Sequence, residues 1–552
     1  FKSKRDAEMY LGRFLLINVR DQDAGRALIR WLYPSITTAL RWPSPKVSGP
    51  VRVPRPEVAT NIAFTFWGLF ALGVPVRTLD SFPSEFIDGM ARRSVILGDR
   101  LRNEPAPEWD PVWAEEWEVH PRPGRAVHIL ITLNAQMTED GEPVPALDER
   151  TRAIRDFCAA SDGGLTLLAG HDSAGADFQE LSAVMDMVDG KPRPTAREHF
   201  GFVDGISDPV FAGQFAPEDE ERRVQGNGKL GRDGKWRPLA TGEFLLGYPD
   251  EAQEIPVGGM LRTFGRNGTF IAYRKLHQNV VAFRTWLDST TPQFGAVYGI
   301  DDPEAARATL LAKIAGRWPD GLPLSLYPDY ARWRAAPTLD PNSPEGRRRL
   351  ADFAYFDDPH GVRCPVSAHT RRANPRDGNG PLPSDGRKPG PSGTVLTDRR
   401  RILRRGLPYG MADPTATTEG EHGIVMLIMC ANLGRQFEFM QQQWVNYGAD
   451  AQVGNDPDPL IGVHPEGCKF VVPTDPLEGR APFIAAPLPP FVETRGGAYF
   501  FCPSMNSLQM LAMGAGIIGP NLAKKITEVF LTTEFEGGRH ARRVGLLDNI
   551  QP

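Results

Sequence analysis

Short apolar runs alternate with stretches of helical spacing along the chain, and this alternation occurs twice. In the first half, residues 14–19 and 127–133 are almost uninterrupted apolar runs, which is typical of buried strands. Helices are predicted after the first run, where Asp23 can act as an N-terminal cap, and near 147–158, and a further strand is predicted at 165–168. These elements follow most of the strand, helix, strand, strand, helix, strand order of a ferredoxin-like unit.

The second half repeats this theme. Strands are predicted at 243–248, 269–273, 423–430 and 495–501, and helices after Tyr273, from Pro303 onward and over 436–444. The run at 423–430 is apolar on both faces, so we expect it at the centre of a sheet. Two histidines fall on these elements: His128 is expected to be a core or edge histidine of its strand, and His277 to cap a helix or lie on the surface at a helix start.

At 552 residues the chain is too long for a single core. We predict an α+β protein of two ferredoxin-like (βαββαβ) units, at 1–215 and 241–552, in a dimeric α/β-barrel-like arrangement. Residues 216–240 mix charges and glycines without periodicity, which predicts an exposed connection. Two similar units that face each other leave one crevice, and a cofactor is expected in it.

Bulk composition excludes several classes of protein. The net charge of −5 argues against a nucleic-acid-binding surface. The longest apolar stretch, 61–76, is interrupted by glycines and a proline and is too short for a membrane span. The first residues contain no apolar leader, and whether one was removed stays open. The five cysteines are far apart and form no C-x-x-C pair, so a reducing, cytoplasmic location is expected.

One carboxylate stands out because it lies between glycines in an apolar run. Residues 200–209 read FGFVDGISDP, with Asp204 near the centre and a closing Pro209 that cannot continue a central strand. Glycines such as Gly205 allow a positive φ or the close approach of something large and flat. An Asp-Gly pair after a hydrophobic run is also typical of an ordinary turn, so this pattern alone makes Asp204 only a candidate for chemistry.

Two further segments give this motif a context. Residues 364–376 read CPVSAHTRRANPR, and residues 400–410 read RRILRRGLPYG. In this order, the three motifs resemble those of the dye-decolorizing peroxidase family, haem enzymes that use hydrogen peroxide. The resemblance extends from about residue 12 to about residue 507.

The resemblance implies a haem b (iron protoporphyrin IX) cofactor and three roles around it. His369 matches the family's axial ligand, and a neutral imidazole is the usual iron ligand in peroxidases. Asp204 matches the distal acid–base group that moves a proton of the peroxide, and Arg404 matches the distal arginine that stabilises developing charge. Activity should favour acidic pH, near a carboxyl pKa of about 4, because Asp204 serves only while it is ionised.

Several arginines near these positions, and Gly205 beside Asp204, are also expected at the cofactor. Arg371, Arg372 and Arg376 could pair with haem propionates, because a guanidinium fork matches a carboxylate, although a solvated basic loop is the alternative reading of this cluster. Arg405 follows Arg404 on a strand, so it should point to the opposite face.

An axial histidine also needs a partner on its second ring nitrogen. Glu493, before the last predicted strand, is the first choice, and Asp458 is the second. Over the distal face, where family members often carry Leu and Phe, this chain offers Met426 and Ile428, which predicts a softer and more oxidisable pocket.

Two features concern access to the cofactor. Residues 376–393 are rich in glycine and proline, which predicts an inserted mobile loop near the haem entrance. Trp444 and Tyr447 resemble the place where some relatives carry a surface radical for bulky donors, although core packing is the favoured reading of Trp444.

Three functional hypotheses follow. The first is a haem peroxidase that reduces hydrogen peroxide and oxidises organic donors, such as dyes and phenolics, by one-electron steps through an oxoferryl intermediate. The alternative is a haem-binding or haem-handling protein, for iron release or storage, with incidental peroxidase activity. The third is a two-domain binding protein without haem, in which Asp204 and His369 are structural. No nucleic-acid or membrane partner is expected, and whether the chain forms a homo-oligomer stays open.

Overall fold

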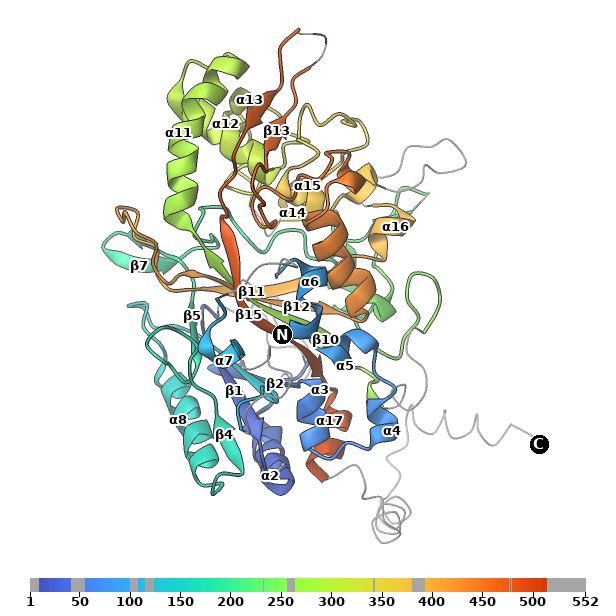
Figure 1. The fold of residues 1–552 in the computed structure, drawn as a ribbon. Helices are drawn as coiled ribbons and strands as arrows, with labels where there is room; N and C mark the ends of the chain where they lie inside the picture. Colours follow the sequence, from blue (N-terminus) through green and yellow to red (C-terminus); the bar gives the residue numbers. More distant parts are fainter. Residues whose placement is uncertain are drawn as a thin grey trace, which may run out of the picture.

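A computed structural model describes the chain over residues 9–40, 55–99, 108–114, 124–231, 233–255, 264–340, 343–379, 393–475, 477 and 479–513. Its main feature is one antiparallel sheet in the order β11-β12-β10-β15-β2-β3-β1-β4, with β5 (Gln179–Ser182) also paired to β1. Figure 1 shows this sheet in the middle of the molecule, with helices above and below it.

The sheet consists of two units with the same strand order. The N-terminal unit contains β1 (Leu11–Val19), β2 (Val58–Phe64), β3 (Ile129–Ala135) and β4 (Leu165–Leu167), arranged as β4-β1-β3-β2. The C-terminal unit contains β10 (Thr269–Gln278), β11 (Leu403–Tyr409), β12 (Gly423–Cys430) and β15 (Val492–Cys502), arranged as β15-β10-β12-β11. In both units the fourth strand lies beside the first, which is the ferredoxin-like order that the sequence predicts.

The two units meet edge to edge, where Phe501 of β15 pairs with Phe64 of β2. At the far ends of the sheet, β11 also contacts β5. Both units contribute to one buried cluster between them, which contains Phe14 and Leu130 from one unit and Tyr273, Val425 and Phe500 from the other. The α+β fold with two ferredoxin-like units is therefore confirmed, whereas the dimeric, barrel-like arrangement stays a prediction.

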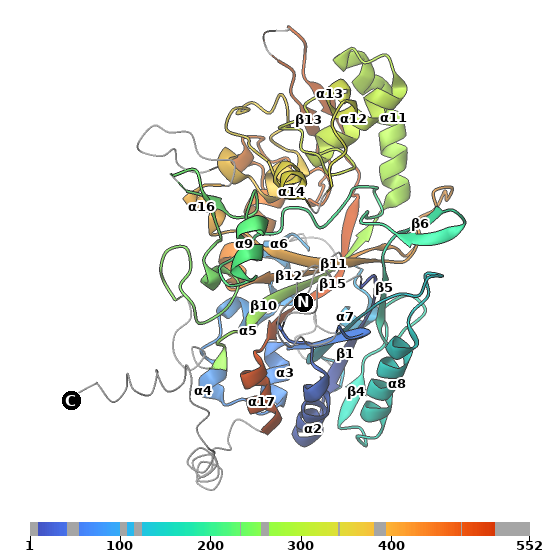
Figure 2. The same ribbon diagram turned by 180° about the vertical axis from the view of Figure 1, so that it is seen from behind.

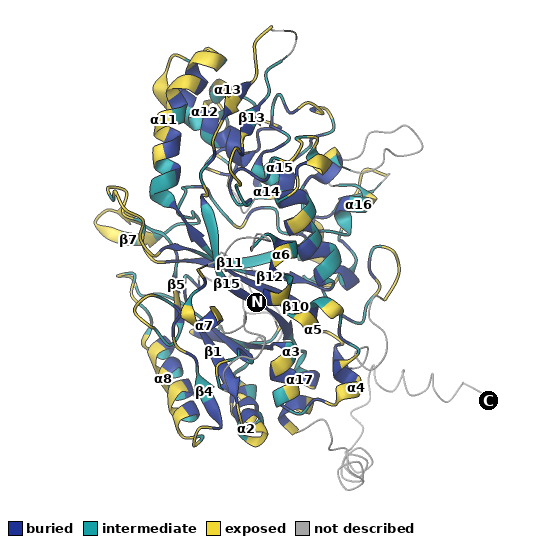
Figure 3. Cartoon of the chain, in the orientation of Figure 1, coloured by how far each residue is buried: buried dark blue, intermediate teal, exposed yellow. Residues whose placement is uncertain are grey.

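Helices cover the N-terminal unit on the face turned away from this cluster. Helix α2 (Gln22–Leu32) begins where the Asp21 carboxylate, two residues before the predicted Asp23, accepts the N–H of Ala24. Together with α8 (Pro145–Ala159), it buries leucine and isoleucine side chains against β1 and β3. Figure 3 shows the consequence: dark blue strands lie inside, and the outward faces of α2 and α8 are yellow.

The C-terminal unit carries a thicker and less regular layer. This layer contains α11 (Val280–Tyr298), α12 (Pro303–Ala315), α13 (Tyr330–Arg334), α14 (Pro344–Leu350), α15 (His369–Ala373) and the π-helical turns η6 (Leu433–Glu438) and η7 (Met440–Val445). These elements form the upper part of the molecule in Figure 1. The predicted helices from Pro303 and over 436–444 fall here, the second as π-helix.

The remaining elements are short. They are α3 (Phe66–Ala71), α4 (Val76–Leu79), α5 (Ser84–Asp88), α6 (Ser94–Leu97), α7 (Pro111–Ala114), β6 (Met185–Val188), β7 (Lys191–Pro194), α9 (Pro217–Arg223), β8 (Lys229–Leu230), β9 (Trp236–Arg237), α16 (Val395–Asp398), β13 (Phe470–Val472), β14 (Phe483–Ala485) and α17 (Met505–Met513). The β6–β7 hairpin extends from one side of the molecule (Figure 2). In the described part of the chain, no helix has the length and apolar character needed to cross a bilayer.

Two sequence predictions about local structure are wrong. Residues 243–248 form no strand, because Glu243 ends a 3-10 turn (Thr241–Glu243) and its buried carboxylate binds Arg435. His277 does not begin a helix: it lies near the end of β10 and is buried, with its ring 5.8 Å from that of His422. His128 lies directly before β3 and is half-buried, and its Nδ1 accepts the N–H of Val19, as expected for a structural histidine at a strand edge.

The predicted division at 216–240 stays a prediction. That connection contains α9 and the short β8–β9 hairpin. Most of the predicted mobile loop, residues 380–392, lies outside the described residues.

Strand β10 binds the N-terminal part of the chain through two buried cations on its opposite faces. Arg274 forms a bidentate ion pair with Asp99, and both side chains are 3% exposed. The next residue, Lys275, points the other way and donates to the carboxylate of Asp110. Successive side chains of a strand face opposite sides, so β10 binds Asp99 on one face of the sheet and Asp110 on the other.

Candidate active site

A cavity of about 720 Å³ lies on one face of the C-terminal unit. The opposite face packs into the buried cluster between the two units, which contains Phe14, Tyr273 and Val425 and is called the shared core below. The floor of the cavity is made by alternate residues of two neighbouring strands: Ile424, Met426 and Ile428 of β12, and Arg274, Leu276 and Gln278 of β10. Val425 and Leu427, between them, point into the shared core. The floor belongs to the C-terminal unit, while Asp99, Glu198 and Asp204 of the predicted first unit also line the cavity, so the expected crevice between the two units stays a prediction.

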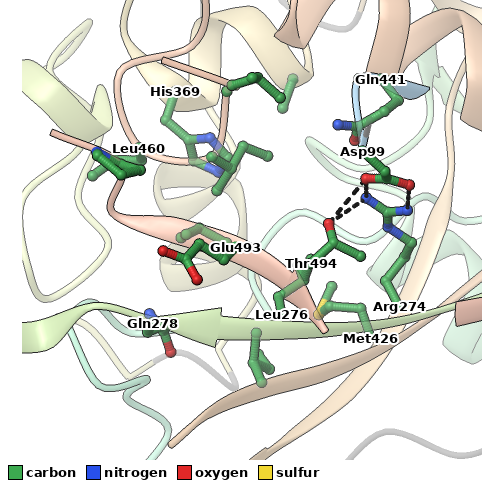
Figure 4. Close-up of a pocket in the computed structure, with 18 of the residues that line it drawn as sticks. Asp99, Arg274, Leu276, Gln278, His369, Met426, Gln441, Leu460, Glu493 and Thr494 are labelled. Atoms are coloured by element: carbon green, nitrogen blue, oxygen red, sulfur yellow. Dashed lines mark hydrogen bonds and ion pairs between the residues drawn. The ribbon is translucent and has the colours of Figure 1, made fainter. Parts of the chain in front are cut away.

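The cavity roof carries His369, the first residue of α15. The Nδ1 atom of His369 lies 2.9 Å from Oδ2 of Asp458, which leaves Nε2 for the cavity. Figure 4 shows the imidazole at the cavity wall, across from the strand residues Leu276 and Met426.

Asp458 is fully buried, and its other oxygen accepts the backbone N–H groups of Leu460 and Ile461. Burial alone would raise the pKa of this carboxyl, but His369 and the two N–H groups hold it below the ordinary value. The first choice of partner, Glu493, is corrected: it lines the same cavity, but its carboxylate accepts from Asn279 and Arg495 instead.

Asp204 also lines this cavity, on a loop whose backbone is held from two sides. Its N–H donates to Ala196 O over 2.7 Å, and the N–H of Val203 donates to Pro319 O. Gly201 and Gly205 take φ values of 94° and 77°. A Cβ on Gly205 would meet no atom within 4 Å, so its backbone conformation, rather than a crowded neighbour, favours glycine there.

Arg404 and Arg405 of β11 point in different directions, as their adjacent positions require. Arg404 lines the large cavity and donates to Ile206 O over 3.1 Å, which ties it to the Asp204 loop. Arg405 does not line that cavity and forms an ion pair with Asp208. The geometry thus supports the choice of Arg404 over its neighbour.

Arg371, Arg372 and Arg376 do not line the cavity, although they are buried. Arg371 binds Asp358 and Cys364 O, Arg372 donates to the carbonyls of residues 444, 445 and 456, and Arg376 donates to Gly226 O. Pairing with propionates is therefore not what these side chains do here. They brace the segment around His369, because each guanidinium group binds carbonyls of other loops.

The remaining expected residues have mixed positions. Met426 and Ile428 line the cavity as predicted. Trp444 is buried and packs against Phe439 with ring centroids 5.5 Å apart, which agrees with core packing. Tyr447, in contrast, is 44% exposed.

Glu198 and Arg317 are among the charged residues of the cavity that were not found from the sequence. Glu198 lies six residues before Asp204, close enough in the chain to have been a candidate. Arg317 follows α12, and no local pattern marks it. Both contact the Asp204 loop: Glu198 accepts the N–H of Phe202, and Arg317 donates to the carbonyl of Val203.

The sequence of this chain is similar to the sequences of known proteins. A dye-decolorizing peroxidase of Exidia glandulosa is 30% identical over 380 residues, which is 64% of this chain and 66% of that protein. The dye-decolorizing peroxidase AauDyP1 of Auricularia auricula-judae is 26% identical over 82% of this chain and 75% of its own length. The chain belongs to the dye-decolorizing peroxidase family. The chain spans just under two thirds of the length of the Exidia glandulosa protein.

The fold of this dye-decolorizing peroxidase family member also matches solved structures. A dye-decolorizing peroxidase in complex with 2,6-dimethoxyphenol superimposes with a TM-score of 0.62, over 92% of this chain and 97% of that one, at 23% sequence identity. At this identity the match establishes the fold.

The end of the chain has a second, local similarity. Residues 501–547 match the Ribose/Galactose Isomerase family, and 46 residues are 48% identical to the putative sugar phosphate isomerase YwlF of Bacillus subtilis, over 8% of this chain and 31% of that protein. Of this segment, the structure describes the end of β15 and helix α17, which packs against α2.

Proposed function

We propose that the protein is a haem peroxidase, which reduces hydrogen peroxide and oxidises organic donors in one-electron steps. The observation that carries the proposal is that His369, Asp204 and Arg404 line one cavity although 165 and 35 positions separate them from His369 in the sequence (369 − 204 and 404 − 369). An imidazole, a carboxylate and a guanidinium group around one cavity are the set that this chemistry requires.

Haem b fits the residues that are present. Cofactor sites are typically 300–1,000 Å³ in volume with mostly apolar walls, and this cavity of about 720 Å³ has Ile402, Met426, Ile428 and Leu460 in its wall. The Nε2 atom of His369 would bind the iron, because Nδ1 is already engaged by Asp458. The bound haem would supply the redox chemistry, in which peroxide is split and single electrons are accepted from donors.

The carboxylate of Asp204 would accept the proton from one peroxide oxygen and return it to the other, which leaves as water. Arg404 of β11, joined to the Asp204 loop by its hydrogen bond to Ile206 O, would stabilise negative charge on the departing oxygen. Asp458 would keep the imidazole in one orientation and make His369 a stronger electron donor to a bound metal. A structure in this family holds 2,6-dimethoxyphenol, and we infer that phenolic donors are also substrates here.

The test is spectroscopic. Purified protein loaded with haem should show a Soret band and react rapidly with hydrogen peroxide, while Asp204→Ala should keep the Soret band and react about 10²–10⁴ times more slowly, as expected for the loss of a general acid–base group. The exposed Asp189→Asn, in the turn before β7, is the matched control. Equal rates for wild type and Asp204→Ala would exclude the proposed proton transfer, and haem binding without any peroxide reaction would favour haem handling.

A further inference from the structure

The carboxylate of Glu198 organises the turn that leads to Asp204. Its Oε2 accepts the N–H of Phe200 over 2.9 Å, and its Oε1 accepts the N–H of Phe202 over 2.8 Å. The backbone closes the same turn, because Glu198 N donates to Phe202 O and Gly201 N donates to Glu198 O. The whole turn, with Gly201 in a left-handed conformation, is thus wrapped around one carboxylate.

This turn is also attached to the floor of the cavity. Gln278, at the end of β10, donates its side-chain amide to Oε2 of Glu198. From the other side, the guanidinium group of Arg317 donates to the carbonyl of Val203, the residue before Asp204. Glu198 and Arg317 therefore hold the Asp204 loop between the strand floor and the end of α12.

Glu198 and Asp204 share two cavities. Both line the large cavity and a second one of about 80 Å³, whose wall also contains Arg404, Arg405 and Asp208. The two acids thus lie on one wall, and each contributes to the electrostatic environment of the other.

We propose that Glu198 is a positioning residue for Asp204, which fixes the turn that presents Asp204 to the cavity and couples the two carboxylate charges. The inference rests on the proposed peroxidase function and names a residue through which it is tuned. Like charges close together resist simultaneous ionisation. A negative Glu198 would therefore raise the pH at which Asp204 becomes ionised and active.

Other charged and titratable groups around Glu198 and Asp204 influence the pH at which each carboxyl ionises. Arg317, just after α12, and Arg404 of β11 both contact the Asp204 loop, and Arg197 lies in the wall of the small cavity. The ring of His199, a residue of the turn, contacts that of His422, which also contacts that of His277. Burial raises the pKa of Glu198, as does the charge of Asp204. The two guanidinium groups work in the opposite direction for both acids, because they favour the charged carboxylates.

The test compares Glu198→Gln with the wild type. The amide oxygen of Gln can still accept an N–H of the turn, but the charge is removed. We expect the acid limb of the rate constant for the peroxide reaction to move to lower pH by about one unit, the size that a nearby charge typically produces, which is a roughly tenfold faster reaction well below the wild-type limb. The pH dependence of cyanide affinity, followed by the Soret band, should move in the same direction and does not depend on turnover.

Two variants complete the design. Glu180→Gln, an exposed acid on β5 with 66% side-chain exposure, should leave both pH profiles unchanged. Glu198→Ala removes charge and hydrogen bonds together, so it should also lower the midpoint of thermal unfolding relative to Glu198→Gln. If an active wild type and Glu198→Gln have the same acid limb and the same cyanide profile, the coupling is refuted while the peroxidase proposal stands. A wild type that binds haem without reacting with peroxide would refute the peroxidase proposal itself.

Discussion

The two ferredoxin-like units have the same strand order but carry different layers on their outer faces. In the N-terminal unit, α2 and α8 pack directly on the sheet, and leucine and isoleucine side chains fill the space between. In the C-terminal unit, the segment between β10 and β12 supplies α15 and the strand β11 with Arg404, and the layer leaves a cavity of about 720 Å³ above β10 and β12.

The difference shows where function resides in this fold. Both units provide a flat apolar surface, but only one is covered by segments that bring a histidine, an aspartate and arginines to the same space. The strand order alone therefore carries no chemistry, which depends on particular side chains of the strands and of the segments that cover them. Substituting a residue with a proposed role at the cofactor should therefore have a larger effect than substituting a matched residue with other contacts.

The largest effect is expected at the histidines of the two units. His369→Ala should abolish stable haem binding, because the imidazole that would bind the iron is lost, whereas His128→Gln should retain haem and lower only the stability of the fold. The Soret absorbance after gel filtration measures both, and added imidazole should restore part of the band in His369→Ala. Full retention of haem by His369→Ala would show that another residue binds the iron.

The neighbouring arginines of β11 provide the next contrast. Arg404→Ala should slow the reaction with peroxide about 10²–10³-fold, as the loss of one charge-stabilising donor typically does. Arg405→Ala breaks the ion pair with Asp208 on the other side of the strand and should have a smaller effect on that rate. Stopped-flow mixing with peroxide measures both, and a larger loss in Arg405→Ala would reverse the assignment.

A smaller effect is expected from the acids near His369. Asp458→Asn should reduce haem affinity about 10–100-fold, because the partner that orients a ligating histidine is weakened. Glu493→Gln should change this affinity little, since its carboxylate binds Asn279 and Arg495 rather than the imidazole. Competition for haem with apomyoglobin gives the affinities, and the reverse order would restore Glu493 as the partner.

The smallest effect concerns stability at acidic pH. Burial lowers the pKa of His128 to about 4, and its Nδ1 must stay unprotonated to accept the N–H of Val19. Because this folded-state pKa lies below the unfolded value of about 6.5, the contribution of His128 is complete above pH 6.5 and is lost as the pH falls toward 4, by about 1.4 kcal/mol per pH unit.

Urea unfolding at several pH values measures this contribution as the difference between wild type and His128→Gln. The difference should shrink by roughly 3 kcal/mol between pH 6.5 and pH 4. Comparison with the variant is needed because buried acids act in the opposite sense: burial raises the pKa of Glu243 and of Asp398 to about 7. A constant difference would mean that His128 titrates normally in the folded protein.

Local patterns in the sequence were sufficient for most strands and for the central residues of the cavity. Uninterrupted apolar runs identify β1, β3 and β12, because strands buried on both faces need such runs. The family motifs identify His369, Asp204 and Arg404, which the structure brings to one cavity, while their catalytic roles stay predictions.

Contacts between distant segments could not be predicted in this way. Asp458 lies 89 positions after His369, and nothing near it distinguishes it from Glu493. The arginines at 371, 372 and 376 resemble an anion site in sequence, but which carbonyls they meet depends on loops far along the chain. Arg317 was not predicted for the same reason, because its contact with the Asp204 loop is a hydrogen bond to the carbonyl of Val203, which is distant in the sequence.

The paired cations of β10 have a consequence for how the molecule can come apart. Arg274 and Lys275 each hold an aspartate from the chain before residue 111, so separating the halves would leave two charges without partners inside the protein. Each such broken pair typically costs about 3–5 kcal/mol. The halves should consequently denature in a single transition, and a fragment beginning at residue 241 should aggregate when it is expressed by itself.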